Sequence, residues 1–176
     1  EVLALLGPLY PDLAFEVVQV RTQGDANPDA LLSELGLGMF VTDIGRQLQE
    51  GLLDMAIHSL KDLPTQMPKN LALGAVLRRL DPRDVLVNRW DCPLTDLPEG
   101  ARIGTSSPRR QALLKHVCPQ VVPVVIRGNV ETRLRKAQGE ECDGVILAAA
   151  GMLRLGLGQQ ITEYLSAQRF VPAPGQ

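Results

Sequence analysis

Cysteine is scarce in this chain of 176 residues, which holds only Cys92, Cys118 and Cys142. The three cysteines lie far apart, their number is odd, and no C-x-x-C pair occurs. This pattern argues against a disulfide framework and against a zinc site, and the two histidines have no partners at metal-ligand spacing. We therefore expect no metal centre. A reducing compartment fits best, so we expect a cytoplasmic protein.

Long apolar runs are also absent, since none approaches the roughly 20 residues that a membrane-spanning helix needs. The first residues, EVLALLGPLYPDLAF, lack the basic region and cleavage site of a secretory signal. We expect a soluble protein without a membrane partner. Nothing in the pattern suggests an obligate interface, so we also expect a monomer.

Aromatic residues make up 3% of the chain, and their distribution bears on a segregated patch of positive charge. The formal net charge is −2, yet residues 100–136 hold eight basic residues and a single acid, Glu131. Single-strand nucleic-acid sites interleave basic and stacking aromatic residues, and this segment has no Phe, Tyr or Trp. The patch therefore predicts an anionic small molecule rather than a nucleic acid.

Apolar runs rich in β-branched residues alternate with amphipathic stretches, which is typical of an α/β protein with largely parallel sheets. Strands are predicted at 15–20, 53–58, 71–77, 85–87, 102–104, 121–126 and 143–149. Helices are predicted at 40–50, 108–118 and 130–138, with a further one beginning over 150–155. The simplest interpretation is two α/β lobes with a ligand site at the carboxyl ends of the strands.

The segment Gly104 to Gln111, GTSSPRRQ, runs from a predicted strand into a predicted helix. Ser107 before Pro108 is a signal for a helix N-terminus, whose free N–H groups attract anions. Arg109 and Arg110 add bidentate donors for carboxylate or phosphate. An ordinary capped helix with solvated arginines explains the same pattern about as well.

The segment Arg127-Gly128-Asn129-Val130 repeats this arrangement after the next strand, and its helix carries Arg133. Two strand ends that offer arginine to one crevice favour a ligand with several carboxylates.

A third segment, HSLKDLP, places Ser59, Lys61 and Asp62 directly after a predicted buried strand. A carboxylate beside a lysine at such a junction suits acid–base chemistry or the role of counter-charge for a developing cation. The alternative is a turn in which Asp62 caps the next segment and Lys61 is solvated.

Six blocks, taken together, resemble the porphobilinogen deaminase family, also called the hydroxymethylbilane synthases. They are HSLKDLPT (58–65), DPRD (81–84), GTSSPRRQ (104–111), RGNVETRL (127–134), DGVILAAAGMLRLG (143–156) and PAPGQ (172–176). The resemblance implies an enzyme that joins four porphobilinogen units head to tail with release of ammonia. It also implies two lobes like those of type II periplasmic binding proteins, each a mixed, mostly parallel sheet flanked by helices, and a third domain that carries a dipyrromethane cofactor on a cysteine.

The resemblance also implies residue roles. Asp62 is the expected catalytic carboxylate, which hydrogen-bonds pyrrole nitrogens and stabilises the cation that forms when ammonia leaves. The residues expected to bind the cofactor are Ser59, Lys61, Thr105, Ser106, Ser107, Arg109 and Arg110. Those expected to bind the substrate are Arg127, Gly128, Asn129, Arg133 and Gln176.

The chain departs from the family in several places. The family's Thr-Arg-x-Ser block would precede Glu1, and the cofactor-bearing cysteine would follow Gln176. Leu37 and Thr42 stand near positions where the family usually has loop lysines, and Pro108 stands where it generally has leucine. We expect this chain to be inactive by itself.

The expected domains are a first lobe over 1–79, to which 170–176 returns, and a basic second lobe over 80–169. The third domain is absent from this stretch. The competing hypothesis is a noncatalytic two-lobed module that binds a polycarboxylate, which explains the arginines but leaves Asp62 without a role.

Overall fold

The computed structural model describes residues 1–20 and 39–176, with side chains described from 43 onward in the second range. The chain divides into two compact units, one formed by 1–56 and 64–71 and the other by 57–63 and 72–176. These bounds differ from those expected for the two lobes, which stay a prediction. Within the described residues, no helix is long and apolar enough to cross a membrane.

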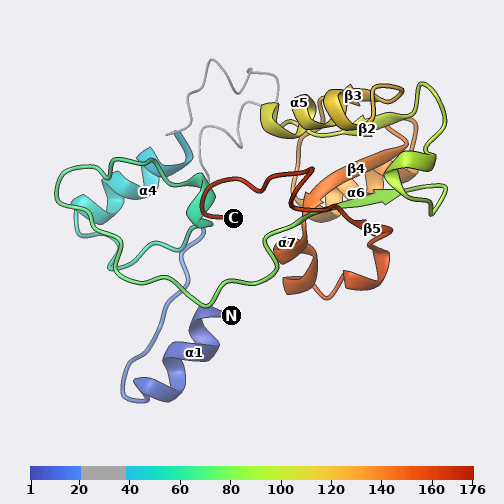
Figure 1. The fold of residues 1–176 in the computed structure, drawn as a ribbon. Helices are drawn as coiled ribbons and strands as arrows, with labels where there is room; N and C mark the ends of the chain where they lie inside the picture. The colour runs from blue at the N-terminus through green and yellow to red at the C-terminus, as the bar shows by residue number, and fades with distance from the viewer. Residues whose placement is uncertain (21–38) are drawn as a thin grey trace. The chain divides into compact units, whose positions relative to one another are not determined.

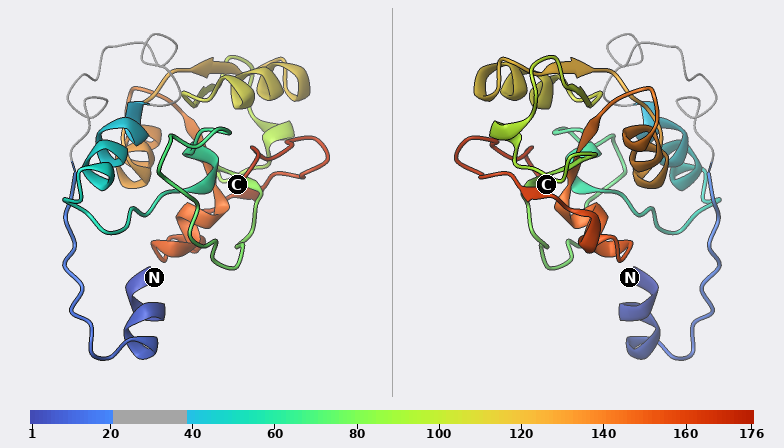
Figure 2. Two further views of the ribbon diagram at one scale, coloured as in Figure 1. Left: turned by 90° about the vertical axis from the view of Figure 1, so that its left-hand side faces the viewer. Right: turned by 90° about the vertical axis from the view of Figure 1, so that its right-hand side faces the viewer.

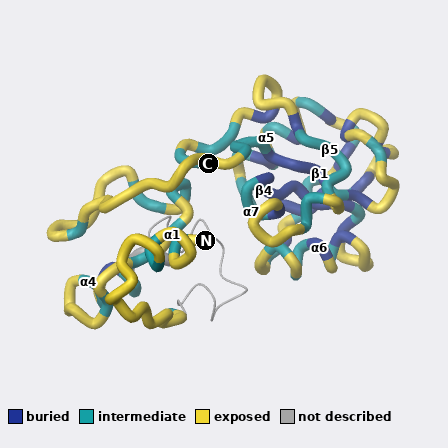
Figure 3. Tube along the Cα trace, turned by 90° about the horizontal axis from the view of Figure 1, so that it is seen from below, coloured by how far each residue is buried: buried dark blue, intermediate teal, exposed yellow. Residues whose placement is uncertain are grey.

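The first unit contains the helices α1 (Val2–Leu9) and α4 (Met39–Gln49). The helix predicted at 40–50 is confirmed, whereas α1 has no counterpart among the predicted elements. Most of the described residues in this unit are exposed (Figure 3).

The three predicted strands at 15–20, 53–58 and 71–77 are wrong for the structure, in which none of them joins a sheet. A strand exists only through hydrogen bonds to a neighbouring strand, and no described segment pairs with these three. Several of their apolar side chains are open to solvent, with Val17 73%, Ile57 59% and Val76 62% exposed.

The second unit is built on one five-stranded sheet, ordered β3-β2-β4-β1-β5 (Figure 1). Its strands are β1 (Asp84–Asn88), β2 (Arg102–Gly104), β3 (Val122–Val124), β4 (Gly144–Ala148) and β5 (Glu163–Tyr164). The pairs β2–β3 and β2–β4 are parallel, and the pairs β1–β4 and β1–β5 are antiparallel. The predicted α/β class and mixed sheet are confirmed here, but the sheet is half antiparallel rather than mostly parallel.

The α-helices of this unit are α5 (Pro108–Val117), α6 (Val130–Gln138) and α7 (Ala149–Arg154). The short 3-10 helices are η1 (Leu60–Asp62), η2 (Leu94–Asp96) and η3 (Gly158–Gln160). Strand β2 and helix α6 have the predicted bounds.

Alternation along the strands makes two cores, one on each face of the sheet. Leu86 of β1 and Ile146 of β4 lie opposite each other and pack with Leu114 of α5. Their neighbours Val85 and Leu147 point to the other face, where the core includes residues of α6 and α7. Helix α5 therefore covers one face and α6 and α7 cover the other (Figure 2).

Candidate functional site

The candidate site lies where the first turn of α5 meets the start of β1, inside the second unit. Ser107 is the N-cap of α5 and Pro108 opens the helix, as predicted. This start places Arg109 and Arg110 in the first turn, from which both side chains reach the carboxylate of Asp84.

Asp84 is the hub of the site. It is fully buried, and an unpaired carboxylate there would be very costly. Its Oδ1 accepts from Arg110 Nη2 at 2.7 Å and from Gln176 Nε2 at 2.9 Å, and its Oδ2 accepts from Arg109 Nη2 at 2.8 Å. Burial alone would raise the pKa of Asp84, but the hydrogen bonds and charge of Arg110, with Gln176 and Arg109, hold that pKa below its usual value.

The two arginines have further partners on the protein. Arg109 Nη1 donates to the carbonyl of Val171 at 2.6 Å, and Arg110 Nη1 donates to the carbonyl of Ile146 at 3.1 Å. The Nε of Arg110 is buried and has no hydrogen-bond partner among the described residues. A buried donor without an acceptor is unusual in folded proteins, so this atom points to a missing acceptor.

Gln176 connects this hub to the HSLKDLP segment. Its Nε2 donates to the carbonyl of Pro82 at 2.7 Å as well as to Asp84, and its Oε1 accepts from Lys61 Nζ at 3.4 Å. The neighbouring Gly175 has a φ of +76°, and a Cβ there would lie 3.1 Å from the backbone nitrogen of Lys61. The PAPGQ segment thus packs backbone to backbone against Leu60 and Lys61.

Four cations form what we call the cationic cluster: Lys61, Arg109, Arg110 and Arg133. Burial lowers the pKa of Lys61, and the charge of Arg110 lowers it further, while Asp62 and Asp84 oppose the shift. Burial followed by the charge of Arg110 also lowers the pKa of Arg133. Arg110 therefore lies within electrostatic reach of both Lys61 and Arg133. Such a cluster attracts anions, carboxylates above all.

The other predicted residues have varied surroundings. Asn129 caps α6 by accepting from the Thr132 N–H at 2.9 Å, and Arg133 Nε donates to the Gly128 carbonyl at 2.7 Å. Gly128 has a φ of +115°, and a Cβ there would lie 2.6 Å from Thr132 Cγ2, so glycine is required. Arg127 is half-buried.

Near α5, Thr105 is fully buried and its Oγ1 accepts from the Ser107 N–H at 3.2 Å, while Ser106 is half-buried. Ser59 and Asp62 are exposed at the two ends of the η1 turn. The charge of Asp62 raises the pKa of Lys61, so Asp62 lies within electrostatic reach of the cluster. The side chains of Leu37 and Thr42 lie outside the described residues.

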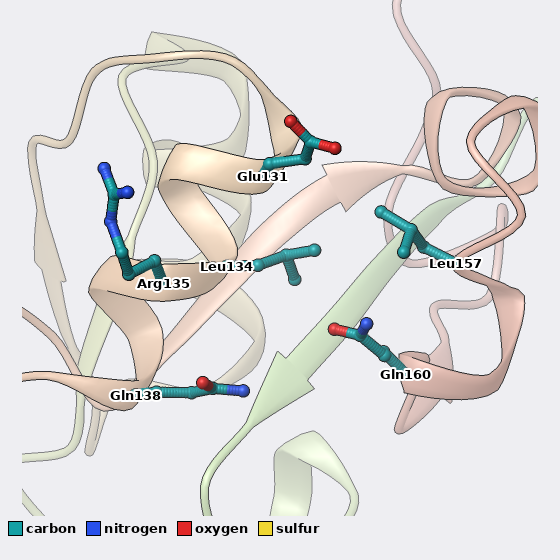
Figure 4. Close-up of a pocket in the computed structure, with 6 residues that line it drawn as sticks. All are labelled: Glu131, Leu134, Arg135, Gln138, Leu157 and Gln160. Carbon is teal, nitrogen blue, oxygen red and sulfur yellow. The ribbon is translucent and has the colours of Figure 1, made fainter.

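A pocket of about 250 Å³ lies elsewhere in this unit, between α6 and the Leu157–Gln160 segment (Figure 4). Leu134 points across it toward Leu157. Its lining includes none of the predicted site residues: it is formed by Glu131, Leu134, Arg135, Gln138, Leu157 and Gln160. With one acid and one base, it lacks the excess charge of the cationic cluster. No group of three or more potential metal ligands occurs among the described residues.

Sequence reasoning missed the role of Asp84. The signal was present, because Asp84 directly precedes the apolar run Val85-Leu86-Val87, and a carboxylate at the start of a buried strand must find cationic partners. It also missed that Gln176 uses its amide on protein groups.

Comparison with known proteins identifies the family. Residues 2–176 match the family model described as "Porphobilinogen deaminase, dipyromethane cofactor binding domain". The porphobilinogen deaminase of Syntrophomonas wolfei is 48% identical over 176 residues, which cover 99% of this chain and 58% of the relative. That of Geobacter metallireducens is 48% identical over 168 residues, covering 95% of this chain and 52% of the relative.

The enzyme of the same name from Alkaliphilus metalliredigens is 46% identical, over 99% of this chain and 56% of the relative. The chain therefore spans a little over half the length of these curated relatives. Because the family model matches nearly the whole chain, and because the matched stretch contains the cationic cluster, this chain belongs to the porphobilinogen deaminase family.

Proposed function

We propose that the protein carrying this chain joins four porphobilinogen molecules head to tail, releasing ammonia at each step, to give the linear tetrapyrrole hydroxymethylbilane. The observation that carries the proposal is the cationic cluster beside Asp62. Lys61, Arg109 and Arg110 converge there from segments far apart in the sequence. Asp84 pairs directly with the two arginines and is connected to Lys61 through Gln176. Porphobilinogen and its oligomers carry acetate and propionate groups, which suit such a cluster.

The residues present fit a dipyrromethane cofactor. Its carboxylates would supply the acceptor that the buried Arg110 Nε lacks, and Lys61 makes only one long hydrogen bond among the described residues. Ser59, Thr105, Ser106, Ser107 and Arg109 complete the proposed cofactor site. When bound, the group supplies the pyrrole end to which the first substrate unit is joined.

We further propose that the cofactor is attached to a cysteine outside this chain. Cys118 and Cys142 are buried, and burial raises the pKa of both thiols, which suppresses the reactive thiolate. Burial also raises the pKa of the half-buried Cys92.

We assign carboxylate binding and charge stabilisation to different side chains of this chain. Lys61 and the arginines pair with carboxylates and orient the pyrrole rings, with Arg127, Arg133, Gly128 and Asn129 on the substrate side. Asp62 lies at the exposed end of η1, and this exposure supports the proposal that its carboxylate accepts pyrrole N–H groups. A carboxylate there stabilises the positive charge that develops as ammonia departs.

The test begins with the intact mass of the full-length protein as purified, combined with Ehrlich's reagent, which reports a bound dipyrromethane. A mass excess of two pyrrole units, a positive colour and consumption of porphobilinogen support the deaminase. An unmodified mass that stays unchanged after incubation with porphobilinogen or preuroporphyrinogen would favour the noncatalytic polycarboxylate-binding module instead.

The finer architecture belongs to the same proposal. We propose a monomer with two lobes like those of periplasmic binding proteins, working in the cytoplasm on a small-molecule substrate. Nucleic acid and membrane are not among its proposed partners.

A further inference from the structure

Asp84 and Gln176 lie at the centre of the cationic cluster, and the hydrogen bonds that the structure gives them all go to protein groups. Asp84 is fully buried and receives three hydrogen bonds from Arg109, Arg110 and Gln176. Gln176 donates to Asp84 and Pro82 and accepts from Lys61, so both ends of its amide are used. Because these bonds connect Asp84 and Gln176 to the cations, their effect on a ligand passes through those cations.

We propose that Asp84 and Gln176 are positioning residues, which hold the Arg109 guanidinium and the Lys61 ammonium in place for ligand carboxylates. This inference rests on the proposed function for the identity of the ligand. It changes the role expected for Gln176 from substrate binding to support of Lys61. It also gives the DPRD block a role at the site.

The arrangement supports positioning because it joins three separate segments through two side chains. Lys61 lies on η1, Asp84 begins β1, and the arginines begin α5. Long cationic side chains lose much rotamer freedom when a ligand fixes them. A protein that fixes them beforehand spares the ligand that loss, which appears as tighter binding.

Gln176→Leu is the sharpest variant, because it removes the link between Lys61 and Asp84 and leaves the buried Asp84–arginine pairs intact. In the full-length protein we expect it to melt near the wild type. Since a hydrogen bond to a charged group is lost, we expect the Kd for porphobilinogen, and for citrate as a simple polycarboxylate probe, to rise roughly tenfold. KM should rise by a similar factor with kcat nearly unchanged.

Asp84→Asn and Asp84→Glu test the hub itself. Asp84→Asn leaves Arg110 as an uncompensated buried charge, so we expect a lower melting temperature together with weaker binding. Asp84→Glu restores the charge and should recover part of the affinity. If Asp84→Asn fails to fold, Gln176→Leu decides the question.

Asp143→Asn is the matched control. Asp143 also pairs with two arginines in this unit, Arg89 and Arg102, but it precedes β4 and does not contact the cluster. It should lower stability without changing the Kd for either probe. The proposal is overturned if Gln176→Leu binds both probes like the wild type, or if Asp143→Asn weakens binding equally.

The failure of this inference can be told from the failure of the proposed function. If Gln176→Leu weakens citrate binding and Asp143→Asn does not, but the wild type never consumes porphobilinogen, the positioning role is kept and the deaminase function is contradicted. If Gln176→Leu consumes porphobilinogen with the Kd and KM of the wild type, the deaminase function is kept and the positioning role is contradicted.

Discussion

Lys61 and Asp62 are adjacent in sequence but differ in environment, and this difference suits them to different tasks. Lys61 is half-buried and linked to Gln176, whereas Asp62 is exposed. A fixed cation beside an accessible carboxylate can hold an acidic substrate and stabilise a developing positive charge at once.

Asp62→Asn in the full-length protein should reduce kcat at least 100-fold, equivalent to about 2.7 kcal/mol of barrier. The amide keeps the size of the side chain but loses the charge that opposes the developing cation. Folding should be intact because Asp62 is exposed. Asp54→Asn, which changes another exposed carboxylate nearby in the sequence, is the control and should keep normal turnover. Near-normal turnover in Asp62→Asn would remove Asp62 from the catalytic role.

Ligand affinity should depend on pH through Lys61. Burial and the charge of Arg110 lower its pKa, so the ammonium loses its proton at a lower pH than an ordinary lysine. A carboxylate ligand pairs with the protonated form; affinity is therefore full below this lowered pKa and is lost as pH rises through it. Probe titrations across alkaline pH measure the loss, with Lys61→Met as the control that should flatten the profile. An identical alkaline profile in Lys61→Met would contradict the assignment.

The contribution of Lys61 to folding stability changes with pH in the opposite direction to its contribution to ligand affinity. Because its folded pKa is lowered, the unfolded chain binds more protons between that value and the ordinary lysine pKa of about 10.4, so its contribution to stability grows with pH across this window. Asp84 contributes stability above its unfolded pKa, which is lost as pH falls through its lowered folded value.

At the scale of elements, the site depends on how short segments begin and turn. Ser107 and Asn129 are the N-caps of α5 and α6, and these helix starts set the directions of Arg110 and Arg133. The Asn129 cap of α6 is well formed. The Ser107 Oγ lies 3.5 Å from the backbone nitrogen of Arg110, so the capping bond of α5 contributes little. The HSLKDLP turn is held instead by the PAPGQ segment, through Gly175 and Gln176.

Gly175→Ala should displace the PAPGQ segment from Leu60 and Lys61. The added Cβ meets backbone atoms about 3.1 Å away, and alanine disfavours the φ of +76°. We expect the free energy of unfolding to fall by about 1–3 kcal/mol, measured by chemical denaturation, together with a rise in KM. Gly139→Ala is the control, because a Cβ at Gly139 would make only ordinary contacts at 3.7 Å. Equal stability of the two variants would contradict the close-packing argument.

At the scale of the whole chain, the buried core described by the structure lies around the five-stranded sheet of the second unit. The fully buried residues of β1 and β4 lie in this unit, and both faces of its sheet are covered. The 15–20 segment of the first unit and the 71–77 segment, which lies mostly in the second, form no strand and have no partner strand among the described residues.

Hydrogen exchange of the 176-residue chain, followed by mass spectrometry, should show this difference. We expect slow exchange in β1 and β4, whose amides are hydrogen-bonded inside a covered sheet, and fast exchange at 15–20 and 71–77. Helix α6, which packs Leu134 and Ala137 into the core, provides an internal reference for protection. Comparable protection of 15–20 and β1 would show that the predicted strand forms a ladder after all.

The elements predicted correctly are those whose signals are local. Pro108 after Ser107, and Asn129 followed by Glu131 with Arg135 and Lys136 near the end, mark α5 and α6 without reference to the rest of the chain. The strand predictions at 15–20, 53–58 and 71–77 failed because apolar alternation reports only that a segment suits a sheet, whereas pairing requires a partner.

The sequence by itself determined the α/β class of the second unit, the two helix starts, the separation of positive charge and the family, because each is written in residue order or composition. Only the tertiary structure decided that Asp84 joins Arg109, Arg110 and Gln176, and that Gln176 reaches Lys61 across 115 positions. Those contacts exist because burying a carboxylate at the start of β1 requires cationic and amide donors. Which donors meet that requirement depends on the packing of α5 and the PAPGQ segment around the strand.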